Sequence, residues 1–143
     1  MSRADYRKLL KATFVEDFDE VDRINADLGD TDWKDSGLLI AAVFSVAIEE
    51  RFAKDSSRSA VKDFITAARA DYAEADNPIK PLVAEGVVRA ALGEEELLDG
   101  ISAAESMQVQ MILAHKIISE GEKSPAEIDA LLDRAEKLLD SSV

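Results

Sequence analysis

Residues 38–48, LLIAAVFSVAI, constrain the fold more than any other part of the sequence, because Ser45 is their only polar residue. The run is well short of the 18–20 apolar residues that a membrane-spanning helix needs. A helix with no polar face is typical of the buried interior of a helical bundle. The pattern therefore predicts a buried helix here, and other helices must cover it.

Apolar residues recur at helical spacing through nearly all of the remaining chain, and no strand-like alternation competes with them. We therefore predict an all-α, single-domain fold over residues 1–143, with six or seven helices around a buried second helix. The sequence shows no internal repeat, low-complexity segment or domain boundary. The predicted helices cover about residues 3–28, 32–54, 60–75, 81–92 and the short stretch 94–99, and two more begin after Ser102 and Ser124.

Several positions predict where these helices begin and end. Ser102 with Glu105, and Ser124 with Glu127, have the spacing of a capping box, in which each side chain bonds the other residue's backbone N–H. Gly93 suits a left-handed helix end. Asp17 falls within the apolar stripe of the first predicted helix. The helix bends there, or the carboxylate lies at the rim, or it is buried with a partner; the cost of burying an unpaired carboxylate favours the rim.

The chain has a net charge of −13, which repels the phosphates of nucleic acids and anionic lipid headgroups. We therefore expect neither nucleic acid nor membrane as a partner. Within residues 16–35, nine acids face only Arg23 and Lys34, so seven of the 13 net charges lie in twenty residues. Such a run either keeps the surface solvated or binds a basic partner. The nine acids are Glu16, Asp17, Asp19, Glu20, Asp22, Asp27, Asp30, Asp32 and Asp35.

The aspartate-rich segment DLGDTDWKDSG, residues 27–37, raises the question of a calcium loop. No register supplies oxygen ligands at positions 1, 3 and 5, glycine at position 6 and glutamate at position 12. A turn between two helices accounts for the same residues, because Gly29 suits a helix end and Asp30, Thr31 or Asp32 suits the next helix start. We therefore predict a turn, with no metal and no cofactor.

Candidate catalytic groups are few. The chain has no cysteine, and His115 is its only histidine. His115 is predicted on a narrow polar strip with Gln108 and Ser119, as a histidine at the boundary of a helix surface. No nucleophile elbow, oxyanion loop or glycine-rich phosphate loop accompanies it. We predict no catalytic residue, and the chain is more consistent with a non-enzyme.

These observations favour a non-catalytic, cytoplasmic protein–protein interaction module, since no apolar signal core opens the chain. Its partner is another protein, with basic character, or a second copy bound through the last helix or the surface around Trp33. The candidate partner surface consists of Asp27, Asp30, Asp32, Trp33 and Asp35.

Three alternatives stay open. The apolar second helix, with Met107 and Met111, fits a binder of a small apolar ligand between helices. An acidic mimic that blocks a nucleic-acid-binding protein is a variant of the interaction module. The third alternative is a divalent-metal enzyme that uses carboxylates, with ligands drawn from Glu16, Glu20, Glu49, Glu50 and Glu85.

Overall fold

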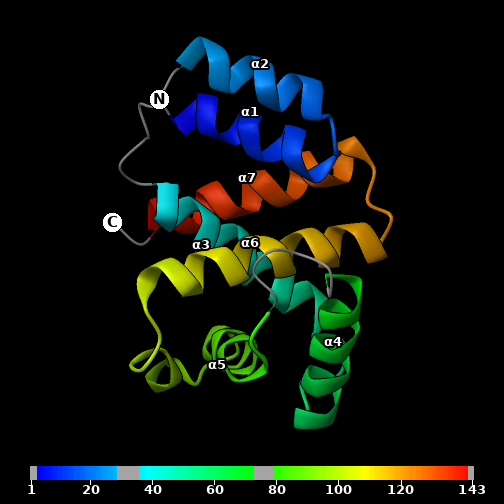
Figure 1. Ribbon diagram of the computed structural model, residues 1–143, viewed down its shortest axis with the longest axis vertical. Helices are drawn as coiled ribbons and strands as arrows, with labels where there is room; N and C mark the ends of the chain where they lie inside the picture. Colours follow the sequence, from blue (N-terminus) through cyan, green and yellow to red (C-terminus); the bar gives the residue numbers. More distant parts are fainter. Residues whose placement is uncertain (1–2, 29–35, 73–78, 142–143) are drawn as a thin grey trace.

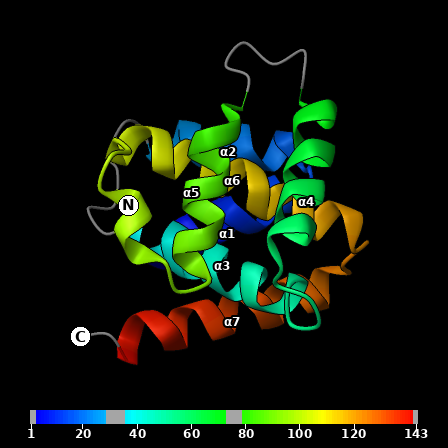
Figure 2. The same ribbon diagram turned by 90° about the horizontal axis from the view of Figure 1, so that it is seen from below.

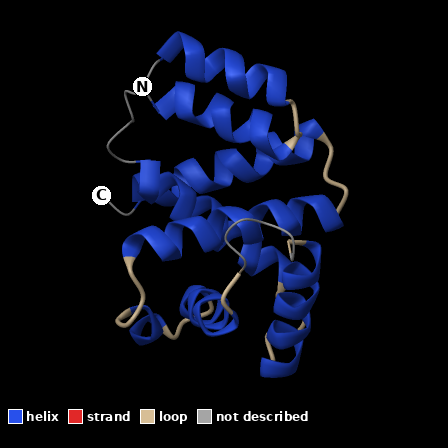
Figure 3. Ribbon diagram, viewed as in Figure 1, coloured by secondary structure: helices blue, strands red, loops and turns tan. Residues whose placement is uncertain are grey.

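The computed structural model describes residues 3–28, 36–72 and 79–141, and every regular element in this part of the chain is a helix (Figure 3). The prediction of an all-α fold is confirmed. The elements are α1 (Arg3–Phe14), α2 (Phe18–Leu28), α3 (Ser36–Arg51), α4 (Arg58–Asp71), α5 (Pro81–Ala91), the 3₁₀ turn η1 (Glu95–Leu98), α6 (Ala103–Glu120) and α7 (Pro125–Ser141).

The helices form layers that run from α2 at one end of the molecule to α4 and α5 at the other (Figure 1). Helix α2 lies outermost and packs mainly against α1, which in turn packs on α7. Helix α3 packs against α7, α6 and α5. Figure 2 shows α4 and α5 side by side in front of α6 and α3, while η1 packs on α5.

The apolar run of α3 is largely buried, as its composition requires. Leu39, Val43, Ala47 and Ile48 lose essentially all contact with solvent against the apolar faces of α6 and α7. Full burial of each Leu, Val or Ile side chain contributes about 1.5–3 kcal/mol to folding. Burial of α3 on every side is not confirmed, however, because Leu38 is 58% exposed.

The single helix predicted over residues 3–28 is wrong, because the chain breaks between Phe14 and Phe18. The N–H of Asp17 donates to the carbonyl of Ala12 at 2.9 Å, and the N–H of Glu16 donates to that of Thr13 at 3.1 Å. This pairing is a Schellman motif, and it places Glu16 in the left-handed region with φ of 60°. Asp17 is exposed and its carboxylate accepts from the N–H of Glu20 at 3.2 Å, so it caps the start of α2.

The ends of α5 and α6 use the same motif. Gly93 has φ of 121°, as predicted, and Glu122 has φ of 48°. Next to Glu122, the capping box of Ser124 and Glu127 is complete, with both hydrogen bonds at 3.2 Å. The Ser102 hydroxyl likewise accepts from the N–H of Glu105 at 3.2 Å.

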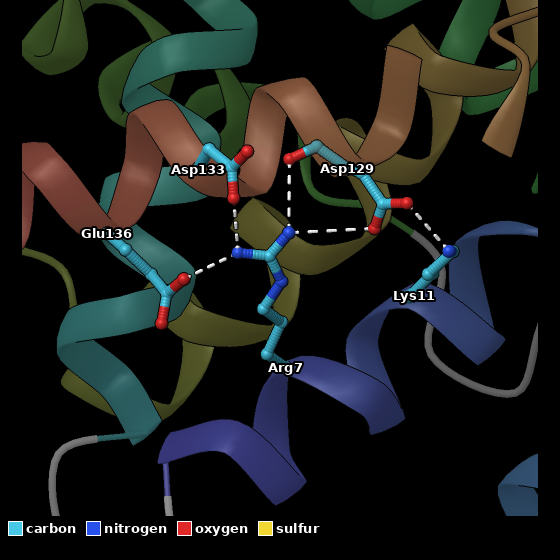
Figure 4. Close-up of polar contacts among 5 residues, drawn as sticks. All are labelled: Arg7, Lys11, Asp129, Asp133 and Glu136. Atoms are coloured by element: carbon cyan, nitrogen blue, oxygen red, sulfur yellow. Dashed lines mark hydrogen bonds and ion pairs between the residues drawn. The ribbon is translucent and has the colours of Figure 1, made fainter. Parts of the chain in front are cut away.

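An ion-pair network joins α1 to α7 (Figure 4). Arg7 Nη1 lies 2.6 Å from both Asp133 Oδ1 and Glu136 Oε2, and its Nη2 donates to the Asp129 carbonyl at 3.2 Å. Lys11 Nζ lies 2.8 Å from Asp129 Oδ2. The hydrogen bond from Lys11, aided by Arg7, holds the pKa of Asp129 below its usual range. The acids of this part of α7 are thus compensated by cations of α1.

Replacing Arg7 by methionine keeps most of the side chain's packing and removes its charge. We expect the free energy of unfolding to fall by about 1–2 kcal/mol, because three acids of α7 lose a half-buried partner. Arg3→Met is the matched control, since the ion pair that Arg3 forms between the same two helices, with Asp140, is more exposed, and about 0.5 kcal/mol is expected there. Urea denaturation measures both changes, and equal losses would contradict the assignment.

The left-handed conformation of Glu122 predicts a stabilising substitution. Glycine adopts this region without the Cβ clash, so Glu122→Gly should raise the free energy of unfolding by about 1 kcal/mol. Glu122→Ala removes the same exposed carboxylate but keeps the Cβ, so it should give no comparable gain. Urea denaturation of both variants checks this, and a glycine variant no more stable than the alanine variant would contradict the strain.

Candidate functional site

The exposed side of α2 and its start carry five exposed acids, which we call the α2 acidic surface. They are Glu16, Asp17, Asp19, Asp22 and Asp27. Ile24 is buried and lies on the side of α2 away from Asp19 and Asp22, and α2 packs on α1. All five acids are exposed, and α2 is the outermost helix of the molecule (Figure 1).

Few cations compensate the α2 acidic surface. Arg23 is the only basic residue within residues 16–28, and it pairs with Glu20 at 2.8 Å and with Asp27 at 3.2 Å. The hydrogen bond from Arg23 lowers the pKa of Glu20. In the part of the chain that the structure describes, no cation forms an ion pair with Asp19 or Asp22. The surface therefore keeps a local excess of negative charge, unlike the acids of α7.

Only one of the five residues of the predicted partner surface lies among the residues that the structure describes. Asp27 lies on α2 as part of the α2 acidic surface. The other four predicted residues, Asp30, Asp32, Trp33 and Asp35, lie outside the described residues, as does most of the segment predicted to be a turn. The structure places Asp27 near the end of α2, 3.2 Å from Arg23, and shows four exposed acids earlier in the chain that the predicted set did not include.

A polar junction connects the start of the α2 acidic surface to the rest of the molecule. The Tyr72 hydroxyl lies 2.7 Å from His115 Nδ1, and His115 Nε2 lies 3.4 Å from Glu16 Oε1. In the neutral tautomer that satisfies both contacts, Tyr72 donates to Nδ1 and the Nε2–H faces the carboxylate. The junction thus joins the end of α4, the middle of α6 and the turn between α1 and α2.

Within this junction, the surroundings of Tyr72 favour the neutral phenol. Burial, followed by the charges of Asp71 and Glu16, raises the pKa of Tyr72, whereas a nucleophilic phenol needs a lowered pKa. The sequence predicted His115 at the boundary of a helix surface, which agrees with its half-buried position on α6. It did not pair His115 with Tyr72, because 43 residues separate them and no local pattern links them.

The carboxylates considered as metal ligands mostly have cationic partners. Glu50 pairs with Arg134 and, at 3.5 Å, with Lys123. Glu85 lies 3.5 Å from Arg89 on the next turn of α5. Cations already neutralise these carboxylates, so they do not form the uncompensated cluster that a divalent ion prefers.

Tyr72→Phe tests the junction through stability. We expect a loss of about 1 kcal/mol at pH 7, because His115 Nδ1 loses a half-buried hydrogen bond. The pKa of Tyr72 is higher in the folded state than in the unfolded chain, where it is about 10. The neutral hydroxyl therefore stabilises the fold fully below pH 10, and this stabilisation is lost as the pH rises from 10 through the folded pKa. The difference between the variant and the wild type should therefore shrink as pH rises through 10. Urea denaturation from pH 7 to 11 measures it, and a constant difference would contradict the burial of this hydroxyl.

Three further findings bear on function. Among residues 3–28, 36–72 and 79–141, no three His, Asp or Glu side chains lie close enough together to hold a metal ion. No helix in those ranges has the length and apolarity to cross a membrane. Comparison with protein-family models, curated proteins and solved structures found no match to this chain.

Proposed function

We propose that this protein is a non-catalytic, cytoplasmic interaction module that binds a basic protein through the α2 acidic surface. One observation carries the proposal. The acids of α7 are compensated by Arg7 and Lys11 of α1, while Asp19 and Asp22 of α2 have no ion-pair partner among the described residues. A basic partner can therefore bind these two carboxylates without first displacing a cation of the described residues.

The position of α2 supports the same proposal. The helix is the outermost layer and packs mainly on α1, so its acidic side is open to a partner (Figure 1). Phe18, at the start of α2, is 59% exposed, and aromatic residues beside charges are typical of protein-binding surfaces. The junction of Glu16, His115 and Tyr72 holds this end of the surface in place.

The charge of the α2 acidic surface also limits how a homodimer could form. Two such surfaces repel each other at contact distance, so a second copy would have to bind elsewhere, and the α2 acidic surface would stay available. An acidic mimic of a nucleic acid uses the same electrostatic attraction and differs only in the identity of the basic partner.

Neutralising two acids tests the proposal. Tagged wild type and Asp19→Asn/Asp22→Asn are used to capture proteins from the native lysate at about 0.05 M and 0.5 M NaCl, where screening differs strongly. We expect a stoichiometric protein on the wild type at low salt, reduced about five-fold at high salt and about five-fold by the variant. Mass spectrometry identifies and quantifies it.

The matched control is Glu49→Gln/Asp63→Asn, which makes the same change in net charge at exposed acids of α3 and α4. It should retain the captured protein. A protein held equally by all three forms would contradict the assignment to α2, and capture by the wild type alone would assign the effect to net charge rather than to this surface. No stoichiometric protein at either salt would contradict the proposed function itself.

A further inference from the structure

A cavity of about 300 Å³ lies between the start of α5 and the face of α6. Its apolar lining consists of Ile79, Val83, Val109 and Ile112. Ile79 and Val109 are buried, and Arg69 Nε donates to the Ile79 carbonyl at 3.3 Å, which holds that wall in place. The volume is at the lower end of the range for small-molecule sites, so it suits a small ligand with an apolar body.

The polar groups of the cavity gather at one rim. Lys80, Glu105 and Gln108 complete the lining. Lys80 Nζ lies 3.6 Å from Glu105 Oε1, and both side chains are well exposed, at 71% and 46%. An ion pair this long and exposed contributes little, so either group can exchange its partner for a ligand's charge.

The backbone at this rim favours a negative ligand charge. Helix α5 begins at Pro81, and the side chain of the preceding residue, Lys80, forms no capping hydrogen bond. The positive end of the helix dipole and the Lys80 ammonium therefore act in the same direction at the same rim. The Gln108 amide adds a potential hydrogen-bond donor, while Glu105 is the one group that opposes an anion.

We propose that this cavity binds a small carboxylic acid with a short apolar chain. The chain contacts Ile79, Val83, Val109 and Ile112, and the carboxylate replaces Glu105 as the partner of Lys80. This site lies on α5 and α6, away from the α2 acidic surface, so it is independent of the proposed interaction with a basic protein. It differs from the apolar-ligand alternative of the sequence, because neither α3 nor Met107 nor Met111 lines this cavity.

Three probes with the same chain and different headgroups test the site: octanoate, octanol and octylamine. Each is titrated into the ¹⁵N-labelled full chain at about 0.15 M salt, which screens the net charge of the protein. We expect saturable shifts at the amides of Val83, Val109 and Ile112, with the highest affinity for octanoate. Absence of saturable shifts with octanoate, or tighter binding of octylamine, would overturn the proposal.

Substitutions locate the chain and the headgroup separately. Val83→Trp fills the cavity and should weaken octanoate binding at least about ten-fold, whereas Leu82→Trp, at an 81%-exposed position that does not line this cavity, should not. Lys80→Gln should weaken octanoate binding about five-fold, and Glu105→Gln should strengthen it two- to three-fold, by about the energy of one exposed charge. The reverse order of these last two variants would overturn the carboxylate assignment.

Discussion

The need to bury the apolar residues of α3 is the constraint on which the rest of the structure depends. Ser45 is the only polar residue in residues 38–48, so most sides of this helix require apolar cover. Helices α6 and α7 supply that cover with fully buried side chains such as Leu113 and Leu132, and α5 adds Val88. The left-handed turn at Glu16 ends α1 shortly before α2 begins, and the left-handed turn at Glu122 ends α6 shortly before α7 begins.

The acidic residues of α7 and α2 differ in whether a cation pairs with them. On α7, acids that face α1 bond Arg7 and Lys11, and their charge serves to hold two helices together (Figure 4). On α2, the helix that lies farthest out, Asp19 and Asp22 have no ion-pair partner among the described residues. Aspartates thus bond cations of a neighbouring helix on α7, whereas Asp19 and Asp22 of α2 have no such partner among the described residues, and only the three-dimensional arrangement distinguishes the two.

Local patterns predicted the features of the fold that depend on neighbouring residues. The capping box of Ser124 and Glu127 and the left-handed Gly93 are confirmed, because each depends on the residue type and a short spacing. The break after α1 was missed because Glu16, not a glycine, adopts the left-handed conformation, and the helical periodicity continues through it. The compensation of the α7 acids was also beyond local patterns, since Arg7 lies more than a hundred residues away from Asp133.

Carboxylate footprinting tests the central claim most directly, because it reads each acid separately. The tagged protein is labelled with glycine ethyl ester and a carbodiimide, alone and in native lysate, and the label on each acid is measured by mass spectrometry. We predict that labelling of Asp19 and Asp22 falls in lysate relative to the protein alone, while labelling of the exposed Asp63 on α4 does not change. Unchanged labelling of Asp19 and Asp22 would contradict the claim that the α2 acidic surface meets a partner.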